Sequence, residues 1–107
     1  MKLEVIKKEK SELFIQASSD QTEFGLDLFW LETLDDLFSN LELDGISKVK
    51  FNFKNITWID SSTLRQIAFH SDNLNKKGIE LILLKVNSHV ERVFKLTHMN
   101  QKITLEP

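Results

Sequence analysis

The feature that most constrains the fold of this chain is a change of hydrophobic period near residue 60. Apolar and polar residues alternate over residues 49–54, which is the period of a β-strand with one buried face. Over residues 64–74, apolar and small side chains recur at the spacing of an α-helix. Between the two patterns lie one acid and three hydroxyl residues, 60–63, and either Ser61 or Ser62 is placed to cap the first helical turn. The sequence therefore predicts a strand-to-helix junction rich in polar groups.

Comparable patterns in the rest of the chain predict further strands and helices. An almost continuous aliphatic run over residues 79–85 is typical of a strand covered on both faces. Gly78 is suited to end the preceding helix, and Ser88 with Glu91 forms a capping box that starts another. The expected strands cover residues 3–7, 13–17, 48–54, 79–85 and 103–105, and the expected helices begin at Asp27, Ser62 and Ser88.

The order of these elements predicts the fold class. From the third strand onward strands and helices alternate, which indicates an α/β fold with parallel crossovers. The first two strands are close enough along the chain to form a hairpin or to flank a larger sheet. A chain of 107 residues can bury one hydrophobic core, so we expect a single domain over residues 1–107.

Composition argues against several functional classes. The formal net charge is -2 and the basic residues are scattered, so no electrostatic footprint for nucleic acid is present. The chain has no cysteine, which rules out disulfides, thiolate metal sites and a cysteine nucleophile. No window is long and apolar enough to suggest direct insertion into a membrane. We therefore expect a cytoplasmic protein that does not bind nucleic acid.

The sequence gives no support for catalysis. None of the three histidines has a second ligand at a spacing that suits a metal, and we expect His70 on a polar helix face, His89 in a capping turn and His98 near a helix end. The Gly-x-Ser-x-Gly elbow of a serine hydrolase and the glycine-rich loops that hold nucleotides are both absent. We expect no metal, no cofactor and no enzymatic activity.

Residues 49–64 resemble the signature of STAS domains, the family of the anti-sigma factor antagonists. That signature is an apolar strand, a few polar residues, an apolar pair and then Asp-Ser-Ser-Gly-Leu at the start of a helix; the chain has Asp-Ser-Ser-Thr-Leu at residues 60–64. Residues 77–84 and 90–97 are similar to the family's glycine-led strand and its last helix. The resemblance implies a STAS-like single domain, with a four- to five-stranded mixed sheet and about three to four helices packed mainly on one face.

The resemblance also implies a role for each residue of the junction. Ser61 follows the acid directly, at the position that is phosphorylated in many family members. Asp60 matches the family's acid, Ser62 its small second residue and Leu64 the core leucine of the helix. Thr63 stands where members usually have glycine, and we expect its branched side chain to limit how closely a partner's backbone can approach the hydroxyl.

Two chemistries are open to these polar side chains. A serine oxygen that caps the helix accepts a backbone N–H and contributes about 1 kcal/mol, whereas a modified serine must face solvent. Ser62 could cap while Ser61 is modified. Asp60 could cap the helix, orient the hydroxyl or prepare it for phosphoryl transfer, and we favour capping and positioning. One helical turn apart, Arg65 and Phe69 form a possible partner-docking face beside Ser61.

The resemblance implies a bacterial regulator that works by partner switching. The unmodified form binds an anti-sigma factor with serine kinase activity and so releases a sigma factor, and a metal-dependent serine phosphatase resets it. Two other functions that the family suggests are an accessory subunit bound to the ATPase of a lipid-transporting ABC complex and a scaffold protomer of a sensory assembly.

Overall fold

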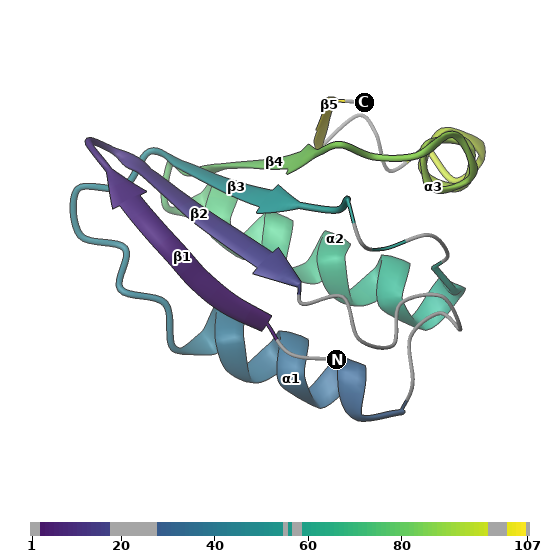
Figure 1. Cartoon of the computed structure of the whole chain (residues 1–107), viewed down its shortest axis with the longest axis horizontal. Helices are drawn as coiled ribbons and strands as arrows, with labels where there is room; N and C mark the ends of the chain where they lie inside the picture. The colour runs from purple at the N-terminus through teal and green to yellow at the C-terminus, as the bar shows by residue number, and fades with distance from the viewer. Residues whose placement is uncertain (1–2, 18–27, 55, 57–58, 99–102, 107) are drawn as a thin grey trace.

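The computed structural model describes residues 3–17, 28–54, 56, 59–98 and 103–106, and the elements of this part of the chain are shown in Figure 1. They comprise five strands and three helices, which alternate after an initial pair of strands. In chain order they are β1 (Leu3–Glu9), β2 (Glu12–Ala17), α1 (Leu28–Ser39), β3 (Lys48–Asn52), α2 (Ser61–Lys76), β4 (Glu80–Leu84), α3 (Ser88–Leu96) and β5 (Thr104–Glu106).

The five strands form one mixed sheet in the order β1-β2-β3-β4-β5. β1 and β2 form the antiparallel hairpin, while β2, β3, β4 and β5 run parallel to one another. The hairpin register shifts between Val5 and Lys7, which marks a β-bulge or irregularity in the edge strand. The α/β class, the mixed sheet and the parallel crossovers are confirmed.

The sheet buries one face, and β3 shows it most clearly. Val49 and Phe51 are buried, whereas Lys48, Lys50 and Asn52 on the other face are partly exposed. α1 and α2 lie beneath the sheet in Figure 1, and α3 lies near the end at which the parallel strands stop. The helices therefore pack mainly on one face, as expected.

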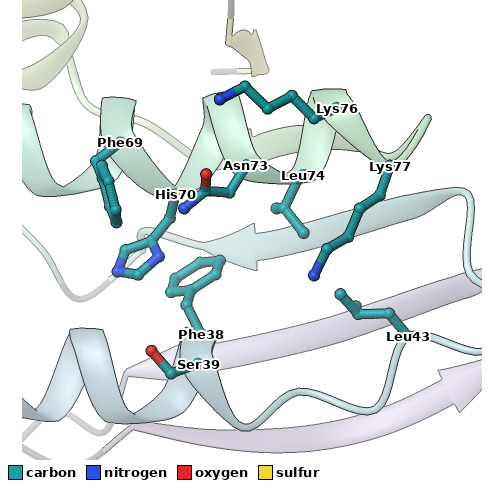
Figure 2. A pocket seen from close by; sticks show the side chains of 9 residues that line it. All are labelled: Phe38, Ser39, Leu43, Phe69, His70, Asn73, Leu74, Lys76 and Lys77. Carbon is teal, nitrogen blue, oxygen red and sulfur yellow. The ribbon is translucent and has the colours of Figure 1, made fainter.

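Aromatic rings join α1 to α2. Phe38 on α1 stacks against His70 on α2, with ring centroids 4.8 Å apart and an interplanar angle of 16° (Figure 2). His70 is only 5% exposed, so its predicted position on a polar helix face is wrong. Because α1 packs on this side of α2, the buried face of α2 includes His70 as well as the apolar residues.

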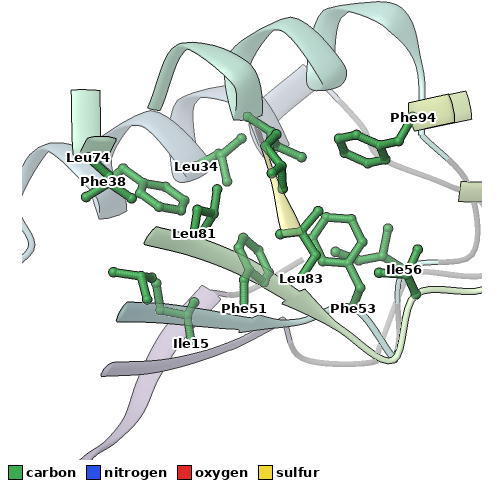
Figure 3. Close-up of a cluster of buried hydrophobic side chains, with 14 of the residues drawn as sticks. Ile15, Leu34, Phe38, Phe51, Phe53, Ile56, Leu74, Leu81, Leu83 and Phe94 are labelled. Carbon is green, nitrogen blue, oxygen red and sulfur yellow. The ribbon is translucent and has the colours of Figure 1, made fainter. Parts of the chain in front are cut away.

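The core lies between the sheet and the helices, and its main side chains are drawn in Figure 3. Phe51 on β3 is fully buried and contacts the ring of Phe53 edge-on, at 4.9 Å between centroids. Phe94 on α3 and Leu34 on α1 belong to the same buried cluster. In β4 three consecutive residues are buried, which confirms that this strand is covered on both faces.

The helix ends differ from the predictions by about one residue. α2 begins at Ser61, and it ends in a Schellman motif in which Ile79 N–H donates to Leu74 C=O and Gly78 has φ of 76°. The cap of α3 is Asn87, whose side chain accepts from Val90 N–H at 2.8 Å; Ser88 is already the first helical residue.

The predicted capping box of α3 is therefore wrong. Glu91 does not reach back to the start of the helix but pairs with Lys95, one turn later, at 2.9 Å. The backbone donor that the box assigns to Ser88 is Glu91 N–H, and it donates instead to the Asn87 backbone carbonyl at 2.9 Å. The predicted start of the first helix at Asp27 lies outside the described residues.

Candidate functional site

The start of α2 is capped by Asp60. The Asp60 backbone is extended, and its Oδ1 accepts a hydrogen bond from Thr63 N–H at 2.8 Å. The Asp60 carbonyl also accepts the first helical bond, from Leu64 N–H at 3.0 Å. The favoured interpretation of Asp60 as a capping residue is confirmed, and the alternative that Ser61 or Ser62 caps the helix is wrong, because both serines already belong to the helix. Asp60 precedes them, where an extended backbone lets a side chain turn back to the third N–H.

The cap leaves Ser61 free at the surface. Ser61 is exposed, Ser62 is half-buried, and the hydroxyl of Ser61 has no hydrogen-bond partner in the described part of the chain. As the first residue of α2, Ser61 lies where the unpaired N–H groups of the first turn give the helix a partial positive charge. The junction therefore presents one unengaged hydroxyl at the positive end of a helix.

Thr63 does not crowd this hydroxyl. Its side chain is only 1% exposed, so it packs inward. Successive helical residues are rotated by about 100°, which places Thr63 about 200° around the axis from Ser61. The expectation that Thr63 limits approach to Ser61 from solvent is therefore not met, since the branched side chain lies on the inner side of α2.

Arg65 and Phe69 continue the exposed surface from Ser61. The three residues are four positions apart and so lie along one stripe of α2, and all three are exposed. Phe69 is 54% exposed, and its ring meets that of His70 nearly edge-on, with centroids 5.3 Å apart. The structure thus brings the candidate switch residue and both candidate docking residues onto one face.

Sequence reasoning missed the contact between His70 and Asp35. His70 Nε2 lies 3.2 Å from Asp35 Oδ1 on α1. Burial lowers the pKa of His70 from its usual value, and the nearby Asp35 carboxylate opposes this by favouring the charged form. Asp35 and Phe38 lie on one helix and His70 on the next. Their positions in the sequence predict a contact only once the two helices are known to pack together.

The chemistry available at the junction is that of a modifiable surface hydroxyl. Asp60 Oδ1 holds a backbone N–H, and no described side chain is hydrogen-bonded to Ser61 as a base would be. Among the described residues, no group of three or more histidines and acids is arranged to hold a metal ion. Within the same residues, no helix is both long and apolar enough to cross a bilayer.

Comparison with known proteins gives consistent similarities. A family model described as STAS domain matches residues 5–107. The anti-sigma-B factor antagonist of Staphylococcus aureus (strain NCTC 8325 / PS 47) is 25% identical over 87 residues, which cover 76% of this chain and 81% of that protein.

Solved structures with this fold include three that cover nearly the whole chain. The anti-sigma factor antagonist SpoIIAA in its unphosphorylated form aligns with a TM-score of 0.71 at 16% identity, over 98% of this chain and 87% of that one. SpoIIAA of Bacillus in the phosphorylated form aligns with a TM-score of 0.65 at 14% identity, over 98% and 91%. A putative anti-sigma factor antagonist of Thermotoga maritima aligns with a TM-score of 0.66 at 17% identity, over 94% and 83%.

Proposed function

Because this chain belongs to the STAS domain family, we propose that it acts as an anti-sigma factor antagonist and that phosphorylation of Ser61 lowers its affinity for its partner. The unmodified chain binds an anti-sigma factor with serine kinase activity, and this frees a sigma factor. A metal-dependent serine phosphatase restores the unmodified form. The chain is a binding module of the bacterial cytoplasm and not an enzyme, so the kinase partner supplies the ATP.

The observation that carries this proposal is the division of roles at the start of α2. Asp60 supplies the cap, so the Ser61 hydroxyl is not needed to hold the helix and faces solvent. A kinase can therefore modify Ser61 without first breaking a hydrogen bond within the described structure. The named relative and the SpoIIAA structures support the general role, while the assignment of Ser61 is our own.

The switch would act through charge at the surface. A phosphate adds about -1.5 to -2 charge beside the positive end of α2, where an anion is tolerated. The fold should therefore survive modification. A partner built around a neutral hydroxyl would instead meet this charge next to the Asp60 carboxylate, and uncompensated like charges at an interface cost several kcal/mol. Arg65 supplies a contact one turn from Ser61 and Phe69 a more distant one, two turns away, since arginine and aromatic side chains commonly dominate interface energies.

The direct test is transfer of phosphate from the cognate anti-sigma factor and ATP, measured as the intact mass of the chain. The native chain should gain one phosphate and Ser61→Ala none, while the matched Ser62→Ala variant should still gain one. Full labelling of Ser61→Ala would contradict the assignment. Recovery of an ATP-binding cassette protein, in place of a kinase-like anti-sigma factor, by affinity capture from the native cell would favour the accessory-subunit function.

A further inference from the structure

A groove separates the second half of α2 from the end of α1, and its surroundings are shown in Figure 2. Its volume is about 460 Å³. It will be called the Phe69 groove, and the residues that line it are Phe38, Ser39, Leu43, Phe69, His70, Asn73, Leu74, Lys76 and Lys77.

The wall of the groove holds an apolar side chain that is already positioned for contact. Phe69 is 54% exposed, while its ring rests edge-on against His70, which in turn stacks on Phe38. This chain of rings anchors Phe69 to the buried contact between α1 and α2. A partner that covers Phe69 therefore loses little conformational entropy in ordering it.

The formally charged side chains that line the groove are all positive. Its lining includes Lys76 and Lys77 but no carboxylate, and in the described structure neither lysine takes part in an ion pair. Lys77 reaches across the opening toward Leu43 in Figure 2, so its ammonium group lies at the mouth. An apolar side chain flanked by carboxylates complements this arrangement, because the apolar side chain would meet the Phe69 ring and a carboxylate would meet the Lys77 ammonium group.

The groove is also far from the switch. Phe69 is eight residues beyond Ser61 and Lys77 is sixteen, which at the rise of an α-helix places them roughly 12 Å and 24 Å away. Both separations exceed the Debye length of about 8 Å at physiological salt. A phosphate on Ser61 should therefore leave the charge of the groove nearly unchanged.

From this geometry we infer that the Phe69 groove binds a segment of the anti-sigma factor in which an apolar side chain is flanked by acidic residues. This inference rests on the proposed function and adds a second point of attachment to it. Contact at Ser61 is lost on phosphorylation, while contact at the groove persists and keeps a weak complex. The phosphorylated chain therefore still binds the anti-sigma factor, but with lower affinity.

Binding of the cognate anti-sigma factor to purified variants, measured by calorimetry, tests this inference. Phe69→Ala should weaken binding by at least about tenfold, and the matched Leu96→Ala variant on α3, which also removes an exposed apolar side chain, should not. Lys77→Glu should weaken binding by roughly three- to tenfold and more at low salt, whereas Arg92→Glu, the same charge change on α3, should have little effect. In a Ser61→Asp background, Phe69→Ala should reduce the residual binding by a similar factor.

The possible outcomes separate the two proposals. If the native chain does not bind the anti-sigma factor, the proposed function fails and this inference fails with it. If Ser61→Asp weakens binding but Phe69→Ala and Lys77→Glu bind like the native chain, only the groove is excluded. Hydrogen exchange on the anti-sigma factor should reveal a protected segment that Phe69→Ala exposes, and such a segment without a carboxylate would overturn the assigned chemistry.

Discussion

The two halves of α2 are built in different ways. At its start, one carboxylate caps the helix and the neighbouring serine is exposed and unengaged. In its second half, His70 and Leu74 are buried, and His70 is held between the helix and α1 by a stacked ring and a nearby acid. The comparison indicates that a side chain at the start of α2 can be modified at little cost to the stability of the fold. The second half of α2 is held in place by packing against α1 and suits a contact surface that does not change.

The largest expected effect on stability comes from the packed half. Leu74→Ala removes a buried side chain from beneath the Phe69 groove, and it should lower the free energy of unfolding by about 3 kcal/mol because a cavity remains. Urea denaturation measures this change. Leu96→Ala, at a side chain that is 74% exposed, is the control and should cost under about 0.5 kcal/mol. Equal losses from the two variants would mean that the second half of α2 is not the packed end.

A smaller effect is expected at the capped start. Asp60→Ala leaves the N–H of Thr63 without its acceptor and should cost about 1 kcal/mol in the same assay. Ser61→Ala and Ser62→Ala should each cost less, since neither side chain caps the helix. If Ser62→Ala lowered the free energy of unfolding as much as Asp60→Ala, the two side chains would share the cap. The start of α2 would then not tolerate changes at its serines as proposed.

The smallest expected effect is a pH dependence at the contact between the helices. Burial lowers the folded-state pKa of His70, so the unfolded chain binds more protons in the range where histidines titrate, and stability should fall as pH falls below about 6.5. His70→Gln should flatten the change in urea midpoint between about pH 7 and pH 5.5. His89 and His98 remain in both proteins and serve as internal controls. A native chain and variant with the same pH profile would contradict the lowered pKa.

The sequence predicted what depends on local pattern. The alternation in residues 48–54 predicted a strand with one buried face, and the pattern after residue 60 predicted α2 to within one residue at its start. The spacing of Ser61, Arg65 and Phe69 predicted their common exposed stripe. These features follow from the periods of strands and helices, which are properties of the chain by itself.

Features that depend on a neighbouring element were missed. His70 is buried because α1 packs over it, and nothing in α2 alone indicates which flank α1 covers. Thr63 lies on the same flank of α2 as the buried Ile67 and His70, so its inward orientation follows from its place around the helix and not from its residue type. The misassigned cap of α3 has a local cause: Asn87 stands one residue before the serine that looked suitable, and a one-residue shift reassigns the cap. At α2 the sequence offered both Asp60 and the serines, and Asp60 is the cap.

The shift of register in β1 has a consequence for how copies of this chain meet. β1 is the outer strand next to β2, and the irregularity between Val5 and Lys7 changes which faces its side chains occupy along its length. A regular strand from another molecule cannot continue both halves of such an edge with matching faces. The irregularity therefore disfavours edge-to-edge pairing between copies of the chain at the exposed Val5 and Ile6.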